Sequence, residues 1–242
     1  LAAMRVVVSI GGSVLAPELD PDRVVAYADA LERLSAKGCE PAAVVGGGGV
    51  AREYITTART LGANEVELDE IGIGATRLNA RLLIAALGET AVPAPTTSYD
   101  EATAAIRRGA LPVMGGMAPG QTTDAVAAAL AESVDADLLV FATGADGVYD
   151  VDPNEHADAT RFDSLSPTEL VDVVLPMSRD AGSSAPVDLL AAKLVDRAGI
   201  RSIVLDGDDP DAVVDAVLHG DHTGTNVIPT DSTPPASWTE ER

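Results

Sequence analysis

The chain repeatedly places glycine directly after a short apolar run, and this pattern restricts what it can fold into. Three such junctions are Gly11-Gly12-Ser13, the four glycines at 46–49, and Gly115-Gly116. Consecutive apolar residues that are rich in β-branched side chains are typical of strands buried on both faces, as in parallel sheets. Because glycine permits close turns and close backbone contacts, these junctions predict tight passages from strand to helix.

Apolar runs of this kind alternate along the chain with longer amphipathic segments. The predicted strands are 5–10, 41–45, 91–94, 111–114, 138–142 and 202–205. The predicted helices are 21–37, 50–61, 70–87, 98–108, 124–134, 167–175, 186–198 and 210–218. The alternation predicts an α/β fold in which helices cover both faces of a mostly parallel sheet. We expect one domain over 4–229 and a disordered tail over 230–242, which is polar and contains two adjacent prolines.

Net charge excludes several classes of partner. The chain has 16 basic and 38 acidic residues, which gives a formal charge of −22 at pH 7. A surface this negative repels phosphate backbones and anionic lipids, so we expect neither nucleic acid nor a membrane as a partner. The longest uncharged stretch, 109–123, is too short and too interrupted by glycine and proline to span a bilayer.

Composition also indicates where the protein works. Lys37 and Lys193 are the only lysines of the sequence, and Asp is more abundant than Glu. This balance is typical of proteins that work in molar salt, where charge repulsion is screened over about 3 Å. An ordinary acidic protein is the alternative. The single cysteine, Cys39, and the lack of a recognisable signal peptide predict a cytoplasmic location.

The glycine junctions are candidate phosphate-binding loops. In an open parallel sheet the loops at the carboxyl ends of the strands lie together, and ligands bind there. Backbone N–H groups and helix N-termini can hold phosphate with few lysines. One glycine pair is more often a tight turn only, but repetition at three strand ends favours phosphate binding. The sequence has no Gly-Lys dipeptide, which excludes a Walker A loop, and no zinc-protease or esterase motif, so we expect no protein metal site.

Longer segments around these glycines resemble the amino acid kinase superfamily. The motifs that carry the resemblance are Ile10-Gly11-Gly12-Ser13-Val14-Leu15, the segment from Val45 to Arg52, and Thr143 to Tyr149 followed by Asp152-Pro153. Within the superfamily the chain resembles the archaeal uridylate kinases in Asp69-Glu70-Ile71-Gly72-Ile73, Thr76-Arg77, Asn79-Ala80, Pro119 to Asp124 and Ala181-Gly182-Ser183-Ser184.

The resemblance implies an α/β/α sandwich with a central, mainly parallel sheet. It implies transfer of the γ-phosphoryl group from ATP to UMP, which gives UDP and ADP for pyrimidine nucleotide (CTP and UTP) biosynthesis. The phosphate acceptor would bind to the N-terminal half of the domain and ATP to the C-terminal half. Mg²⁺ would accompany ATP, and the chain would assemble as a homohexamer.

The resemblance also supplies candidate ligand-binding residues. The candidates for ATP are Gly12, Ser13, Gly48, Arg52, Thr143, Tyr149 and Asp152. The candidates for UMP are Gly47, Asp69, Met117, Ala118, Pro119, Gly120, Gln121, Thr122 and Thr123. The guanidinium of Arg52 can donate to two phosphate oxygens at once, and the carboxylate of Asp69 can accept hydrogen bonds from a ribose or a uracil edge.

Catalysis of this reaction needs alignment and charge neutralisation more than proton transfer, because a phosphate acceptor is already ionised near neutral pH. We select Lys193 as the candidate that stabilises the transferring group and Asp146 as the candidate that organises the site. Lys193 has a plainer interpretation as the partner of Asp196 on a solvated helix face. Many members of the superfamily carry a lysine or an acid where this chain has Ser9, and some carry a lysine where it has Val50.

Three other functions are compatible with parts of the sequence. Another kinase with a phosphate acceptor, such as isopentenyl phosphate kinase, would need a histidine near that phosphate, but the first histidine is His156. A nucleotide sensor without turnover would explain Ser9 and Val50. A nicotinamide dehydrogenase is suggested by the G-x-G-x-x-A pattern at 46–51, with acids at 65, 67 and 69 that precede a predicted helix rather than end a strand.

Overall fold

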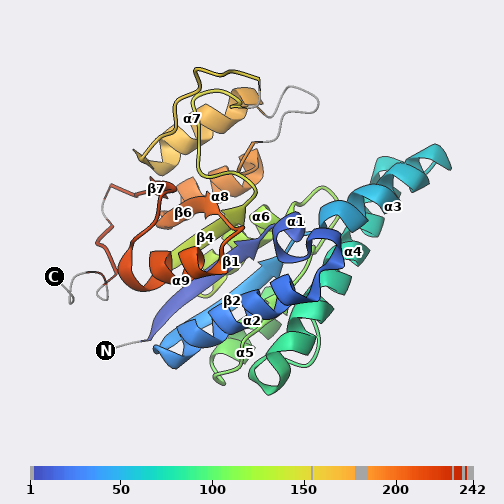
Figure 1. Ribbon diagram of the computed structural model, residues 1–242, viewed down its shortest axis with the longest axis horizontal. Helices are drawn as coiled ribbons and strands as arrows, with labels where there is room; N and C mark the ends of the chain where they lie inside the picture. Colours follow the sequence, from blue (N-terminus) through green and yellow to red (C-terminus); the bar gives the residue numbers. More distant parts are fainter. Residues whose placement is uncertain (1–2, 154, 178–184, 231, 236–237, 239–242) are drawn as a thin grey trace.

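A computed structural model describes residues 3–153, 155–177, 185–230, 232–235 and 238 (Figure 1). Its described strands form one seven-stranded sheet in the order β3-β2-β1-β4-β6-β7-β5. The strands are β1 (Met4–Ile10), β2 (Cys39–Val45), β3 (Val113–Met114), β4 (Leu138–Thr143), β5 (Ser164–Leu165), β6 (Ser202–Asp206) and β7 (Thr225–Val227). Neighbouring strands are parallel except β6 and β7, which are antiparallel. The prediction of a mainly parallel sheet is confirmed.

Helices cover both faces of this sheet. They are α1 (Gly12–Leu15), α2 (Pro21–Ala36), α3 (Gly48–Thr60), α4 (Glu65–Leu87), α5 (Tyr99–Ile106), α6 (Thr123–Ser133), α7 (Pro167–Met177), α8 (Leu189–Ala198) and α9 (Pro210–His219), with 3-10 turns at 17–19 and 88–90. Buried side chains of α2, α4 and α9 pack on one face, and those of α5, α6, α7 and α8 pack on the other. Figure 1 shows α3 and the start of α4 projecting from the end of the sheet.

The alternation of side chains along β1 divides the core into these two layers. Val6, Val8 and Ile10 point into the layer beneath α2 and α9, whereas Val7 points into the layer beneath α6. All four are fully buried. A strand that is apolar on both faces must lie in the middle of a covered sheet, which is where β1 lies.

Two sequence predictions differ most from the structure, one in the existence of a strand and one in the start of a helix. The segment 91–94 forms no strand; Ala91 makes only a single bridge to Leu111 before the chain turns into bends. Helix α4 begins at Glu65, five residues before the predicted start, because Asn64 and Glu67 form a capping box. Strands β5 and β7 were not predicted, since two or three residues carry too little pattern to be recognised.

The segment 230–242 is predicted to be disordered, yet two of its described residues contact the fold. The indole N–H of Trp238 donates to the backbone oxygen of Val217 at 2.8 Å, and the Arg201 guanidinium lies 5.9 Å from the ring centroid. Ser232 accepts a hydrogen bond of 3.0 Å from Arg201. A large aromatic ring with one N–H gains from covering an apolar surface beside a backbone carbonyl, which accounts for the contact of Trp238. Residues 231, 236–237 and 239–242 lie outside the described part.

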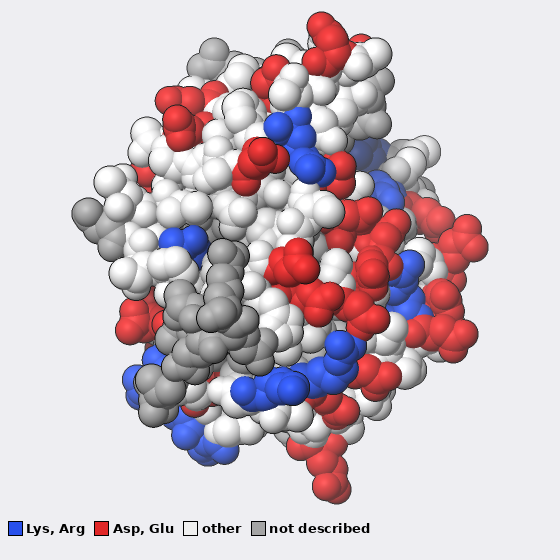
Figure 2. Space-filling view, turned by 60° about the vertical axis from the view of Figure 1, so that its left-hand side comes forward, with Lys and Arg blue, Asp and Glu red and all other residues white. Residues whose placement is uncertain are grey.

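Charged side chains crowd the surface. Figure 2 shows acidic groups spread over one face of the molecule, with arginines and lysines lying among them. Ion pairs include Arg5 with Glu40 at 2.9 Å and Arg59 with Glu65 at 3.4 Å. In the described part of the chain, the helices include none with the length and apolar character that a membrane crossing requires.

Candidate active site

The candidate residues lie in loops that follow four neighbouring strands at one edge of the sheet. The register of β1 with β2 and β4 aligns Ile10 with Val45 and Ala142, so these strands end at the same level. Taken in the order of the sheet, the loops are 115–122 after β3, 46–47 after β2, Gly11 after β1 and 144–153 after β4. The predicted gathering of loops at the carboxyl ends is confirmed.

The first two glycine loops touch each other through backbone atoms. A Cβ added to Gly12 would lie 2.2 Å from the nitrogen of Gly48 and 2.4 Å from the oxygen of Gly46. Gly48 has a φ of +62°, and a Cβ there would meet the backbone of Gly12 at 2.5 Å. Only glycine fits both sides of this contact. The contact places the amide-rich start of α1 against the start of α3.

Arg52 and Ser13, two of the ATP candidates, meet above this contact. A terminal nitrogen of the Arg52 guanidinium donates to the Ser13 hydroxyl at 3.0 Å. Arg52 is exposed and lies one turn into α3. The remaining guanidinium donors can therefore bind phosphate oxygens at the mouth of the two loops.

Helix α4 holds the glycine loops from the side. The buried amide of Asn79 donates to the backbone oxygens of Gly46 at 2.9 Å and Gly47 at 3.2 Å. The Thr76 hydroxyl accepts a hydrogen bond of 2.7 Å from the N–H of Gly116. Each of these loops, after β2 and after β3, is thus hydrogen-bonded to the same helix. The motifs contain Thr76 and Asn79, but give them no role.

The acceptor candidates also lie together. The carboxylate of Asp69 on α4 accepts a hydrogen bond of 2.7 Å from the N–H of Gly120. Gly120 has a φ of +78°, which a side chain disfavours. The structure therefore brings Asp69 into contact with the loop 117–123. Because Asp69 lies within α4, as do the acids at 65 and 67, none of them ends a strand, and the dinucleotide interpretation of 46–51 loses its support.

The starts of two helices, α6 and α8, lie together at the end of the loop 117–123, which we call the acceptor loop. Thr122 caps α6 by accepting from the N–H of Ala125 at 3.1 Å, and its hydroxyl donates to the carboxylate of Asp188. Asp188 in turn caps α8 by accepting from the N–H of Leu190 at 2.8 Å and of Ala191 at 3.1 Å. The starts of α6 and α8 thus lie next to each other. Unpaired N–H groups at helix starts attract anions.

A half-buried carboxylate lies beneath the acceptor loop. Asp124 accepts a hydrogen bond of 2.7 Å from the buried hydroxyl of Ser9 at the end of β1. Burial is the main cause that raises the pKa of Asp124 to about 6; the bond from Ser9 opposes this shift, and the nearby carboxylate of Asp188 contributes to it. Ser9 therefore acts as the hydrogen-bond partner of Asp124 in this chain.

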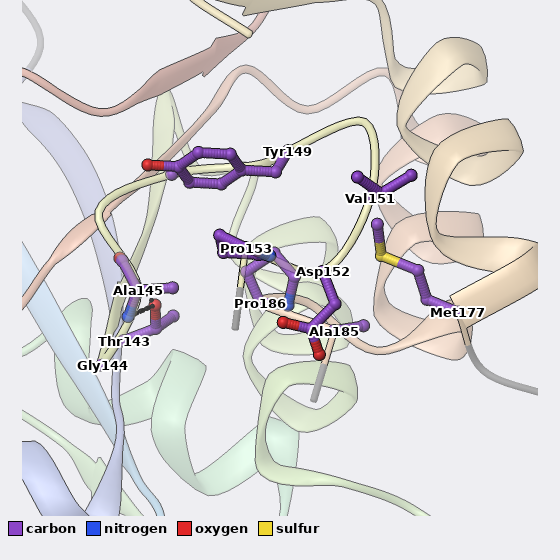
Figure 3. Close-up of a pocket in the computed structure, with 11 residues that line it drawn as sticks. Thr143, Gly144, Ala145, Tyr149, Val151, Asp152, Pro153, Met177, Ala185 and Pro186 are labelled. Atoms are coloured by element: carbon purple, nitrogen blue, oxygen red, sulfur yellow. Dashed lines mark hydrogen bonds between the residues drawn. The ribbon is translucent and has the colours of Figure 1, made fainter. Parts of the chain in front are cut away.

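A pocket of about 260 Å³ opens beside the end of β4. Three of the ATP candidates, Thr143, Tyr149 and Asp152, line it. Figure 3 shows the ring of Tyr149 on one side and the side chains of Val151 and Met177 on the other. An aromatic ring facing apolar side chains suits a flat, apolar base. The resemblance did not identify Val151 or Met177, because neither residue belongs to a motif of the family.

The two catalytic candidates lie in different places. The carboxylate of Asp146 accepts from the Tyr149 hydroxyl at 2.8 Å and from Arg161 at 3.1 Å, so it contacts a residue that lines the pocket but does not line the pocket itself. Lys193 is exposed on α8, one turn and a half after the cap at Asp188, and forms no ion pair with another candidate residue in the described part. Asp196 accepts instead from Thr168 at 2.9 Å, and the described residues show no ion pair between Lys193 and Asp196.

Parts of the site fall at the edge of what the structure describes. The motif Ala181-Gly182-Ser183-Ser184 lies outside the described residues. Within the described ranges, no group of three or more His, Cys, Asp or Glu side chains is arranged to hold a metal ion.

Comparison with known proteins agrees with this geometry. The model described as "Amino acid kinase family" matches residues 4–206. A uridylate kinase from Halorubrum lacusprofundi is 76% identical over 236 residues, which are 98% of this chain and 98% of that protein. A uridylate kinase from Halobacterium salinarum is 64% identical over 226 residues, which are 93% of this chain and 94% of that protein.

A solved structure has the same fold. The crystal structure of uridylate kinase from Archaeoglobus fulgidus matches with a TM-score of 0.83 and 42% identity, over 93% of this chain and 100% of that chain. The sheet order, the facing glycine loops and these similarities define the fold of the amino acid kinases. The chain belongs to the amino acid kinase family.

The contact between the glycine loops predicts opposite effects for two similar substitutions. Gly12→Ala places a methyl group against backbone atoms that cannot move independently, so we expect a loss of about 3 kcal/mol in the free energy of unfolding. Gly49→Ala is the control, because nothing lies within 4 Å of its added Cβ and alanine favours helix by about 0.5–1 kcal/mol. Thermal unfolding in molar KCl measures both. Equal stability of the two variants would contradict the tight contact.

The raised pKa of Asp124 predicts a pH-dependent stability. Below pH 3.8 the carboxyl group is protonated in both folded and unfolded chains; between there and about pH 6 only the unfolded chain releases its proton, so folding loses stability as pH rises. We expect Asp124→Asn to stabilise the ligand-free protein by about 1–3 kcal/mol above pH 6.5, and by progressively less toward pH 4. Denaturation midpoints from pH 5 to 8 measure the difference. Asp29→Asn, an exposed position on α2, controls for the loss of one charge; a constant difference for Asp124→Asn would refute the expectation.

Proposed function

We propose that this chain is a UMP kinase, which transfers the γ-phosphoryl group of ATP to UMP and releases UDP and ADP for pyrimidine nucleotide (CTP and UTP) biosynthesis. One observation carries the proposal. The order of the loops along the sheet edge is acceptor loop, two glycine loops and pocket. This order matches the order of the groups in the reaction: UMP, the transferring phosphate and the remaining phosphates, and the adenosine of ATP.

The proposed ATP site joins the pocket to the glycine loops. The base would lie between Tyr149 and the apolar residues opposite it, with Thr143 and Asp152 at the ribose side. The phosphates would extend over the N–H groups of the loops at 12–13 and 48. Arg52, held near Ser13, would neutralise part of their charge. We propose Mg²⁺ as part of the ATP substrate.

The proposed UMP site lies on the other side of the glycine loops. The carboxylate of Asp69 would accept from the nucleoside, and residues 117–123 would enclose it, with Gly47 behind. The phosphate of UMP would face the starts of α6 and α8, where Thr122 and Asp188 meet. The dipoles of both helices favour an anion at that place, whereas the carboxylate of Asp188, which caps α8, opposes it.

This arrangement accelerates the reaction by alignment and electrostatics. An attacking phosphate oxygen of UMP is already ionised, since the second pKa of a phosphate monoester is about 6, and no general base is needed. What remains is to hold two polyanions in line and to neutralise the charge on the transferring group. Arg52 and the N–H groups of the loops supply part of the positive charge that this neutralisation needs. We propose that Lys193 supplies the rest when both substrates are bound.

The proposal extends to the conditions under which the protein works. The relatives from halophilic archaea and the charge of −22 support a salt-rich cytoplasm as the place of action. Apolar side chains exposed on α3, on α4 and in the turn between them, such as Tyr54, Leu78 and Leu61, support self-association. We expect the homohexamer, which sedimentation velocity in molar KCl would measure.

An acceptor panel tests the proposed reaction. With Mg-ATP in molar KCl, we expect UMP to be phosphorylated faster than CMP, AMP or isopentenyl phosphate, because Asp69 and the acceptor loop present polar groups to a nucleoside. Release of UDP, measured by chromatography, gives the rates. A different preferred acceptor would overturn the assignment, and binding of both nucleotides without any UDP would favour a sensor.

The role proposed for Lys193 predicts a specific kinetic change. We expect Lys193→Ala to lower kcat by at least about 100-fold while the KM for UMP changes by less than about threefold, because the charge is needed mainly in the transition state. Lys37→Ala is the matched control, since Lys37 is the other lysine and lies at the far end of α2. Equal turnover of the Lys193 variant and the control would show that Lys193 is only a surface residue.

A further inference from the structure

The loop that forms the wall of the pocket is paired with a second segment of chain. The N–H of Phe162 donates to the oxygen of Val148 at 2.9 Å, and the N–H of Asp150 donates to the oxygen of Thr160 at 3.1 Å. Between these bonds, residues 149 and 161 face each other as an antiparallel pair. Directly opposed side chains in such a pair lie on the same side and interact. Arg161 is therefore a neighbour of Tyr149, although no motif includes it.

One carboxylate joins these two side chains. The Tyr149 hydroxyl donates to one oxygen of Asp146 at 2.8 Å, and Arg161 donates to the other oxygen at 3.1 Å. Arg161 also donates to the backbone oxygen of Asp146 at 3.3 Å. The bond to Asp146 raises the pKa of the Tyr149 phenol, so the phenol stays protonated and remains a donor. The three side chains form a chain of contacts that ends on the ring in the pocket wall.

The packing beneath this cluster holds the stem of Arg161 in place. A Cβ on Gly147 would lie 2.6 Å from Cδ of Arg161 and 2.7 Å from the hydroxyl of Thr225, so the glycine leaves the room that the arginine occupies. The Thr225 hydroxyl accepts from the N–H of Val148 at 2.9 Å and donates to the oxygen of Phe162 at 2.6 Å. Both sides of the pair are thus tied to β7.

We propose that Arg161 is a positioning residue for ATP, which acts through Asp146 to hold the ring of Tyr149 at the wall of the base pocket. Asp146 is then the link between the two rather than a group that touches the transferring phosphate. The inference rests on the proposed function, since it takes ATP to be the occupant of the pocket. A ring that is held in place loses less freedom when a base packs against it, so the cluster favours binding of the base.

Three variants test this chain of contacts. Arg161→Met removes the guanidinium, Tyr149→Phe keeps the ring but removes its bond to Asp146, and the third variant combines both. We expect each single change to raise the KM for ATP by about three- to tenfold, the effect of losing one or two hydrogen bonds, with kcat and the KM for UMP changed less than about twofold. The double variant is expected to match the worse single variant, because both changes break the same chain.

Two controls separate positioning from other roles of Arg161. Arg197→Met removes another arginine paired with a carboxylate, Glu132, at the far ends of α8 and α6, and should leave the KM for ATP unchanged. Inorganic tripolyphosphate, a competitor without a base, should inhibit Arg161→Met as strongly as the unmodified enzyme. If Arg161→Met does not fold, Asp146→Asn takes its place with the same expectations.

The results have distinct meanings. An unchanged KM for ATP in Arg161→Met, or effects that add in the double variant, would overturn the proposal. Weaker inhibition by tripolyphosphate would also overturn it, because Arg161 would then bind the phosphates directly. Calorimetric binding of ATP by the same variants needs no acceptor, so it tests the cluster even if UMP proves not to be the substrate.

Discussion

The close contact of two glycine loops is the interaction on which the site depends. Gly12 and Gly48 approach so closely that neither tolerates a side chain, and this approach brings the starts of α1 and α3 together. Arg52 can then reach Ser13, and a patch of N–H groups forms where phosphates can lie. A site of this kind relies on backbone donors and few cations, which suits a chain with only two lysines.

Helix α4 holds the loops of the site in place through hydrogen bonds. Its polar side chains hold the loop after β2 through Asn79, the loop after β3 through Thr76 and the acceptor loop through Asp69. Because the acceptor loop continues the loop after β3, two segments that are distant in sequence are hydrogen-bonded to one rigid helix. Rigid placement matters because phosphoryl transfer depends on alignment of donor and acceptor. The negative surface would not prevent the proposed binding of nucleotides in molar salt, since the attraction would be local and the repulsion is screened there.

The fold and the site were predictable from sequence to different degrees. Apolar runs such as 5–10 and 138–142 predicted strands correctly, because a strand buried on both faces needs no alternation to be recognised. The strand predicted at 91–94 was wrong, and the short strands β5 and β7 were missed, since their pairing depends on distant residues. The glycine motifs indicated the loops that meet at the candidate site, whereas nothing near Arg161 indicated that it contacts Asp146.

What the sequence alone determined was local: where strands end in glycine, where helices are capped, and how negative the surface is. The tertiary structure decided which of these places meet. Asp69 and Gly120 are 51 residues apart and Ser9 and Asp124 are 115 residues apart, yet each pair shares one hydrogen bond. Periodicity and capping act over a few residues, so they leave a pattern in the sequence. Contacts between distant segments arise only when strand order and register bring them together, and that pairing leaves no local pattern to read.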